Sequence, residues 1–275
     1  MKAALIQLRT PASQAAALAQ AEPLIREAVA AGAEFVLTPE CSNIVQKNRP
    51  KLFEVLTTQE EDLCVQGLIA LAAELKIWLL IGSALVRRAD GGAANRSILV
   101  APDGHIAATY DKMHMFDVDL PTGEKARESE AYTPGETAVI AATPLGKLGL
   151  TICYDVRFPY LYRALAKGGA EIMTVPACFT RPTGEAHWEI LLRARAIETG
   201  SFVLAPAQGG FHEDGRGTWG RSIAIGPWGE VLALADHDEP GFVIADLELD
   251  AVAKARQAIP ALKNERSFTG PVLAG

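Results

Sequence analysis

Short apolar runs alternate along the chain with longer amphipathic segments. A short apolar run between turn residues is typical of a buried strand, whereas apolar residues recurring every three or four positions indicate a helix. In the first half the pattern predicts strands at Lys2–Leu8, Glu34–Leu37 and Ile77–Val86, helices at Ala12–Ala31 and Glu60–Leu75, and a hairpin of Ser97–Ala101 with His105–Tyr110. This order of elements is typical of an α/β protein.

The second half repeats the alternation. It predicts strands at Leu148–Ile152, Glu171–Val175, Ser201–Pro206, Arg221–Ile225, Glu230–Leu234 and Gly241–Leu247, with helices at Tyr160–Lys167, Glu185–Glu198 and Asp250–Ala258. Each half contains a βαβ unit followed by hairpin strands, which predicts two mixed sheets packed face to face with helices outside. No linker composition separates the halves, so we expect one domain over residues 1–275.

The longest stretch without a strand or helix signal is Lys112–Thr137. Irregular segments of this length in a compact domain usually have a function. We therefore expect it to contribute to a site.

Composition narrows the range of functions. The chain has 275 residues, 49% hydrophobic and 21% charged, with a net charge of −7, which argues against a nucleic-acid or anionic membrane partner. No apolar run reaches the length of a membrane span, and the short apolar N-terminus resembles a first strand more than a signal peptide. The four cysteines show no C-x-x-C spacing, so we expect a cytoplasmic protein with free thiols.

The run Leu148–Pro159 has the strongest chemical signal. An apolar strand ends close to Cys153, and turn residues and a predicted helix follow, which places the thiol where open α/β sheets bind their ligands. Such a turn also offers the next backbone N–H, that of Tyr154, to an oxyanion. Taken alone, Cys153 also fits a buried core cysteine.

Two further polar residues follow predicted strands. Glu40 comes after Thr38-Pro39, and Lys112 comes just after the second hairpin strand. Alone, Glu40 equally fits a solvated or helix-capping carboxylate, and Lys112 fits a solvated charge. Phosphate-binding, dinucleotide-binding, zinc-protease and serine-hydrolase motifs are all missing from the sequence, so we predict no metal and no cofactor.

Together these segments resemble the nitrilase, or carbon–nitrogen hydrolase, superfamily over nearly the whole chain. The resemblance implies that Glu40, Lys112 and Cys153 form a catalytic triad, and that Glu128 supports Lys112 and the substrate. It also implies a four-layer αββα sandwich that forms a homodimer through its helices. The reaction expected from it is hydrolysis of an amide through a thioester on Cys153.

The segments Cys153–Pro159 and Ala186–Thr199 are similar to the deaminated glutathione amidase branch of this superfamily. The substrate implied is a small anionic amide, so an arginine should bind a carboxylate. The candidates are Arg157, Arg181 and Arg216, with His187 and His114 near the pocket, although each arginine fits a structural salt bridge equally well. The chain departs from its relatives at Tyr160, where they usually have an acidic residue.

Other functions stay open at this stage. An ω-amidase or N-carbamoyl-amide hydrolase would use the same triad with another pocket. Tyr154-Asp155 favours amides over nitriles, because true nitrilases typically have Trp-Glu after the cysteine. A non-catalytic interaction protein is a third alternative, and the complete set of Glu40, Lys112, Glu128 and Cys153 argues against it.

Overall fold

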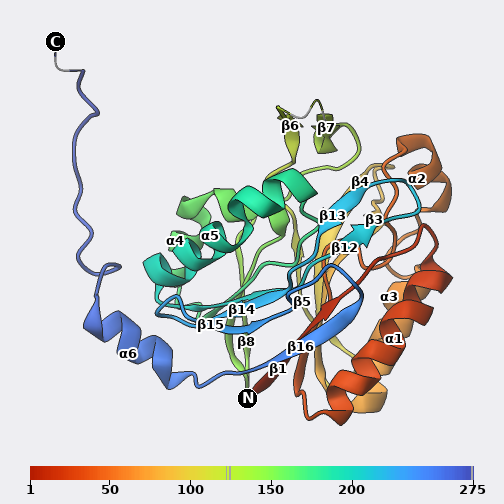
Figure 1. The fold of residues 1–275 in the computed structure, drawn as a ribbon, viewed down its shortest axis with the longest axis horizontal. Coiled ribbons are helices and arrows are strands. Elements are labelled where there is room, and N and C mark those ends of the chain that lie inside the picture. The colour runs from red at the N-terminus through yellow and green to blue at the C-terminus, as the bar shows by residue number, and fades with distance from the viewer. Residues whose placement is uncertain (122, 124, 274) are drawn as a thin grey trace.

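Two six-stranded sheets form the centre of the molecule in the computed structural model, which describes residues 1–121, 123, 125–273 and 275 (Figure 1). The first sheet has the order β16-β1-β2-β3-β4-β5. Its strands are β1 (Lys2–Gln7), β2 (Phe35–Leu37), β3 (Trp78–Arg87), β4 (Ala93–Val100), β5 (Ile106–Asp111) and β16 (Gly241–Asp246). Strands β1, β2 and β3 are parallel, whereas β4, β5 and β16 join by antiparallel pairing.

The second sheet has the order β15-β14-β11-β10-β9-β8. Its strands are β8 (Val139–Thr143), β9 (Gly146–Leu150), β10 (Ile172–Thr174), β11 (Phe202–Ala205), β14 (Ile223–Ile225) and β15 (Val231–Leu234). Strands β9, β10 and β11 are parallel, and the remaining strands pair antiparallel. The predicted α/β fold with two mixed sheets is therefore confirmed.

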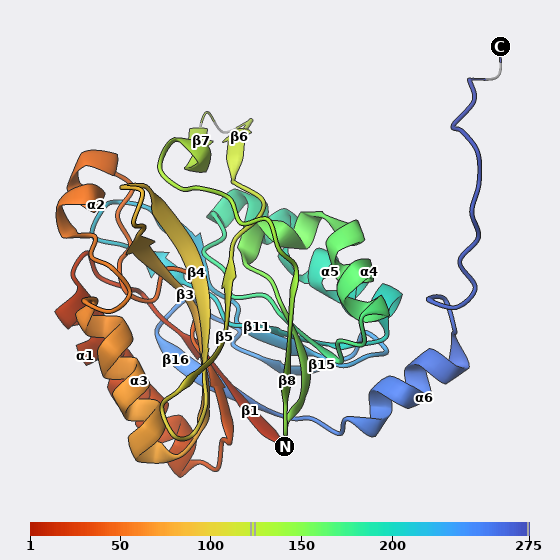
Figure 2. The ribbon, with the colours of Figure 1, turned by 180° about the vertical axis from the view of Figure 1, so that it is seen from behind.

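Helices cover the outer faces of both sheets (Figure 2). They are α1 (Gln14–Ala30) and α3 (Leu63–Leu75) on the first sheet, α4 (Pro159–Lys167) and α5 (Arg181–Thr199) on the second, and α2 (Arg49–Val55) and α6 (Asp250–Ala258) at the periphery. The side chains of Ser13 and Asp62 accept hydrogen bonds from the first turns of α1 and α3, as helix N-caps do. Among the described residues no helix is long and apolar enough to cross a membrane.

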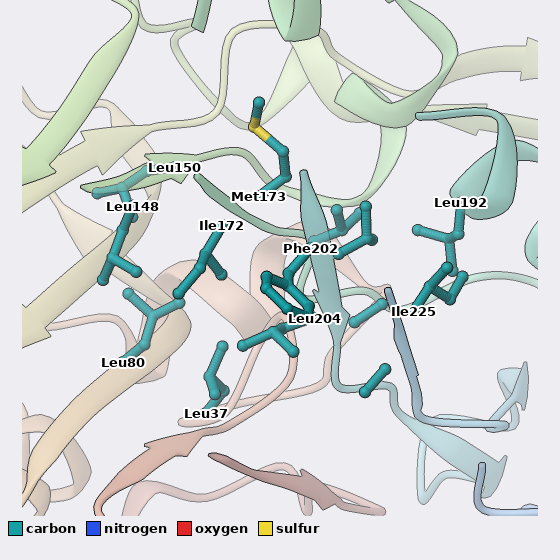
Figure 3. Packing of buried hydrophobic residues seen from close by; sticks show 14 of the residues in the cluster. Leu37, Leu80, Leu148, Leu150, Ile172, Met173, Leu192, Phe202, Leu204 and Ile225 are labelled. Atoms are coloured by element: carbon teal, nitrogen blue, oxygen red, sulfur yellow. The ribbon is translucent and has the colours of Figure 1, made fainter. Parts of the chain in front are cut away.

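Apolar side chains fill the space between the sheets. Leu37 and Leu80 of the first sheet face Leu148 and Ile172 of the second, and all four are fully buried (Figure 3). On the outer side of the second sheet, Leu192 of α5 belongs to the same cluster. The two sheets are therefore held by one continuous core, which sets the spacing between their strand ends.

The structure corrects the predicted elements in several places. Lys112–Thr137 is not wholly irregular, because it contains a small hairpin of β6 (Asp117–Asp119) and β7 (Lys125–Arg127) and a 3₁₀ turn, η1 (Glu128–Glu130). Sequence analysis missed α2, β8 and a second hairpin of β12 (Gly209–Phe211) with β13 (Gly217–Trp219). Helix α5 begins at Arg181, whereas the predicted helix begins at Glu185. The earlier start is possible because Pro182 fits the first turn of a helix.

Candidate active site

The candidate site lies where strand ends of the two sheets meet. Strands β2, β3 and β5 run in one direction, so Glu40, after β2, and Lys112, after β5, leave the first sheet at the same edge. Cys153 and Cys178 follow the parallel strands β9 and β10 of the second sheet. A cavity of about 580 Å³ at this edge is lined by Glu40, Cys153 and Cys178, a size typical of small-molecule sites.

The Glu40 carboxylate is buried and accepts three hydrogen bonds. Its Oε1 accepts from Lys112 Nζ at 2.8 Å and from Asn95 Nδ2 at 2.8 Å, and its Oε2 accepts from the Cys178 backbone N–H at 2.8 Å. Burial alone would raise the pKa of Glu40, but the charge of Lys112 and the hydrogen bonds from Lys112 and Asn95 lower it. Glu40 is therefore ionised at neutral pH and available as a base.

Lys112 bridges two carboxylates inside the protein. Its Nζ lies 2.8 Å from Glu40 Oε1 and 2.8 Å from Glu128 Oε2. Burial acts to lower the pKa of Lys112, but the charges of Glu128 and Glu40 outweigh it and raise that pKa well above its ordinary value. The side chain is therefore a fixed ammonium group and a poor nucleophile.

Glu128 comes from η1, in the segment after Lys112. Its Oε2 also accepts a hydrogen bond of 2.8 Å from the Phe116 backbone N–H, which fixes the carboxylate against Lys112. Glu128 lines the cavity with Glu40 and Cys153. The structure thus brings together the four polar residues that sequence analysis grouped.

Cys153 sits on a strained turn. Its φ is +49°, a conformation that costs free energy in a non-glycine residue and occurs often at functional sites. Its backbone N–H donates to Pro176 O at 2.9 Å, which ties the turn to the end of β10. Burial, followed by the charge of Glu40, raises the pKa of the Cys153 thiol well above its ordinary value.

Tyr154 is the second residue of the 3₁₀ turn η2 (Cys153–Arg157). The first N–H groups of a helical turn have no partner within it, and the Tyr154 N–H donates to no acceptor among the described residues. The Tyr154 ring lies edge-on to the Phe116 ring at 5.1 Å, and both residues line the cavity. The backbone N–H next to Cys153 is therefore free to bind an oxygen atom of a ligand.

Three residues expected to bind substrate do not line the cavity among the residues that the structure describes. Arg157 donates to His187 Nδ1 at 3.3 Å and lies over the Phe179 ring. Arg181 is paired with Asp238 at 2.5 Å. Arg157, Arg181 and His187 thus each have a protein partner for a polar group, and their contact with substrate stays a prediction.

His114 and Tyr160 also lie outside the described cavity wall. The His114 ring stacks on Phe158 at 3.6 Å, and its Nδ1 lies 2.6 Å from Asp155 Oδ1. The Tyr160 hydroxyl is a hydrogen-bond partner of His114 Nε2, and Tyr160 is 64% exposed. Tyr160, where the chain departs from its relatives, thus makes a surface contact with His114, which in turn contacts Asp155.

Sequence analysis missed Asn95 and the cavity positions of Cys41 and Cys178. Asn95 is a buried amide within the mostly apolar strand β4, and a polar residue in such a strand is the one sequence signal for it. Its contact with Glu40 depends on tertiary structure. Cys41 and Cys178, which no motif in the sequence singles out, both line the cavity. Among the described residues no cluster of His, Cys, Asp and Glu is suited to a metal ion.

Comparison with known proteins identifies the family of this chain. The sequence profile of the carbon–nitrogen hydrolase family matches residues 2–257. The chain is 38% identical over 266 residues to a deaminated glutathione amidase of Yersinia enterocolitica, covering 96% of this chain and 92% of that protein.

Two solved structures have the same fold. Saccharomyces cerevisiae Nit3, a member of branch 10 of the nitrilase superfamily, superposes with a TM-score of 0.86 at 30% identity over 97% of each chain. An amidase from Nesterenkonia sp. AN1 carrying acrylamide on its active-site cysteine superposes with a TM-score of 0.79 at 25% identity, over 94% of this chain and 98% of that one. This chain therefore belongs to the carbon–nitrogen hydrolase family.

Proposed function

We propose that the protein is an amidase in which Cys153 attacks the carbonyl carbon of an amide and Glu40 acts as the base. One observation is the main support for this: an ionised, buried Glu40 and a neutral Cys153 thiol share the cavity wall, and the Lys112 ammonium group lies 2.8 Å from Glu40 Oε1. A neutral thiol is a weak nucleophile and needs a base in reach. The lowered pKa of Glu40 and the raised pKa of Cys153 imply that the proton moves as the sulfur attacks.

Two donors are suited to the oxyanion that forms on attack. The Tyr154 backbone N–H has no acceptor among the described residues, and Lys112 keeps its charge between Glu40 and Glu128. Fixed donors that face a developing negative charge are among the largest contributions to catalysis. We assign both groups to oxyanion stabilisation.

Collapse of the tetrahedral intermediate completes acylation. Protonated Glu40 gives its proton to the leaving nitrogen, the C–N bond breaks, and the acyl group remains on Cys153 as a thioester. Glu40 then takes a proton from water as the water attacks the thioester, and the acid is released with the thiol restored. The hydrogen bonds from Asn95 and Cys178 keep Glu40 oriented for both steps.

We propose deaminated glutathione as the substrate, with 2-oxoglutarate and cysteinylglycine as products. The relative from Yersinia enterocolitica bears that name and is similar along 96% of this chain. A cavity of about 580 Å³ is large enough for a ligand of this size. The ω-amidase and N-carbamoyl-amide hydrolase alternatives differ only in the shape and charge of the pocket.

A substrate panel tests this proposal. The purified protein is assayed with deaminated glutathione, a 2-oxo acid ω-amide and an N-carbamoyl amino acid, and kcat/KM is compared. We expect the highest value for deaminated glutathione. A higher value for either of the others would replace this substrate, and no turnover of any amide would contradict the amidase assignment.

We also propose a homodimer, with the chain acting as one domain in the reducing cytoplasm. Ile190 and Ile197 of α5 and Trp228 are exposed by 71%, 57% and 61%, and the segment after α6 extends away from the body (Figure 1). Phe268 and Leu273 in that segment are exposed. Light scattering should give twice the chain mass of 29.3 kDa, and a monomer would contradict the proposal.

A further inference from the structure

The wall of the active-site cavity is more basic than the protein as a whole. The chain has a net charge of −7, yet five basic and three acidic side chains are among the described residues of the wall: Lys47, Arg49, Lys125, Arg127 and Arg216 against Glu40, Glu128 and Glu130. A cleft lined by one sign of charge concentrates ligands of the opposite sign. The cavity is thus suited to an anion.

Arg216 is linked to the proposed base, Glu40, through contacts with Cys178. Its Nη1 lies 3.8 Å from Cys178 Sγ, and the backbone N–H of Cys178 donates to Glu40 Oε2. Cys178 therefore lies between the Arg216 guanidinium and Glu40, the proposed base. The Arg216 side chain keeps 30% of its accessible surface, which is consistent with its place in the cavity wall.

The guanidinium of Arg216 has unused donors. Among the described residues, the nearest carboxylate oxygen is Asp214 Oδ2, 3.9 Å from Arg216 Nε, which is longer than a hydrogen bond. Asp214 is already used by the backbone N–H groups of Lys47 at 2.7 Å and Arg216 at 2.8 Å. Among the described residues, the Arg216 guanidinium donates to no oxygen, whereas Arg181 Nη1 donates to Asp238 Oδ2 at 2.5 Å.

The turn between β12 and β13 fixes the position of Arg216. The backbone N–H of His212 donates to Arg216 O at 2.9 Å. His212 is itself anchored, with Nδ1 3.2 Å from Thr10 O and Nε2 2.9 Å from Thr218 Oγ1. Burial would lower the pKa of Arg216, but Cys178, Cys41 and Asp214 raise it, so the group stays cationic.

We propose that Arg216 binds a carboxylate of the substrate and makes the enzyme select anionic amides. This inference rests on the proposed amidase function and adds a specificity-determining residue to it. Arginine matches a carboxylate with two parallel N–H donors, and the open donors of Arg216 lie next to Cys178. In deaminated glutathione the carboxylate is either that of the 2-oxo acid or that of the terminal glycine.

Matched substrates distinguish these two carboxylates. Arg216→Gln and Arg216→Lys are assayed on deaminated glutathione, its C-terminal glycinamide and a neutral aliphatic amide, with Arg26→Gln as the control because Arg26 is paired with Glu22 and Glu74 at the surface of α1. We expect Arg216→Gln to lower kcat/KM for deaminated glutathione about 10- to 100-fold, mainly through KM. An equal loss on the glycinamide assigns the 2-oxo acid carboxylate, and a loss confined to the free acid assigns the glycine carboxylate.

Two results of this assay would overturn the inference. The first is unchanged kcat/KM of Arg216→Gln for every anionic amide. The second is an equal loss on the neutral amide, which would show that Arg216 only maintains the structure. Arg216→Lys keeps the charge without the paired donors, so it should recover part of the loss if a carboxylate is bound.

Alkylation of Cys153 tests Arg216 even if no amide is turned over. Iodoacetate and iodoacetamide differ in charge, and peptide mapping reports the rate of each at Cys153. We expect Arg216→Gln to lower the iodoacetate-to-iodoacetamide rate ratio about five- to tenfold and Arg26→Gln to leave it unchanged. An unchanged ratio in Arg216→Gln would overturn the role of Arg216, whereas failure of the amidase proposal would appear only in the turnover assays.

Discussion

Lys112 Nζ lies 2.8 Å from both Glu40 Oε1 and Glu128 Oε2, so one buried ammonium group is shared by two carboxylates. This arrangement keeps Glu40 ionised next to a thiol that burial keeps neutral. It separates the roles in the site: a carboxylate that moves protons, a sulfur that forms a bond, and a cation that stays charged throughout.

Lys112→Met should abolish activity and destabilise the protein. The substitution leaves the buried Glu40 carboxylate and the partly buried Glu128 carboxylate without their cation, and breaking a buried ion pair costs about 3–5 kcal/mol. We expect kcat to fall by at least about 100-fold, with a lower midpoint of urea unfolding. Adding Glu128→Gln should recover stability without activity. A Lys112→Met protein with normal turnover would refute the electrostatic role.

Asn95→Ala should move the acid limb of the pH profile to higher pH. Asn95 Nδ2 donates to Glu40 Oε1 and helps to lower the pKa of Glu40, so its loss raises that pKa. Because Asn95 Oδ1 is buried with no partner in the described part of the chain, the substitution removes only the hydrogen bond to Glu40 among the described side-chain contacts. A hydrogen bond to a charged group contributes about 1.5–3 kcal/mol, so we expect kcat/KM to fall roughly 10- to 100-fold. An unshifted acid limb would contradict the orienting role.

The pH dependence of kcat/KM should be flat across neutral pH. The pKa of Glu40 is lowered from 4.5, so the base loses its charge only in more acidic solution. The pKa values of Cys153 and Lys112 are raised well above 9.0 and 10.5, so neither titrates below about pH 9. The assay uses S-methylated deaminated glutathione, so that ionisation of the substrate thiol does not contribute to the pH profile. A bell-shaped profile centred near pH 6–7 would indicate a titrating histidine and contradict this assignment.

Gly82→Ala should displace the segments that hold Glu40 and Cys153. A Cβ atom at Gly82 would lie 1.8 Å from Thr38 O and 2.5 Å from Pro176 Cβ, and these residues lead to Glu40 and accept the Cys153 N–H. We expect destabilisation of about 1–3 kcal/mol and a lower kcat. Gly241→Ala is the control, because its Cβ would meet only His237 at 3.8 Å. Unchanged kcat in Gly82→Ala would show that the site tolerates the displacement.

The sequence predicted the residues that follow strands and missed those that depend on tertiary contacts. Glu40, Lys112 and Cys153 come directly after strand signals, so strand direction alone brings them to one edge. The contact of Asn95 with Glu40 spans 55 residues, and no local pattern reports it. The arginines show the same limit, because only the fold distinguishes the paired Arg181 from Arg216 in the cavity wall.

The missed elements have a similar cause. Strands β6 and β7 are three residues each and mostly charged, so they show no alternation of apolar and polar positions. Contacts across the hairpin help to hold them, such as the ion pair of Arg127 with Asp119 at 2.7 Å. Burial patterns predict the core strands well, but a hairpin held by polar contacts leaves no such pattern.

Direct detection of an acyl group on Cys153 tests the central claim most sharply. The protein is mixed with deaminated glutathione, quenched in acid within the first turnovers and analysed by peptide mass spectrometry, with Cys153→Ala as the matched control. The account predicts a 2-oxoglutaryl thioester on the Cys153 peptide, lost on treatment with hydroxylamine, and no turnover by Cys153→Ala. Undiminished turnover by Cys153→Ala, with no adduct in the native protein, would contradict it.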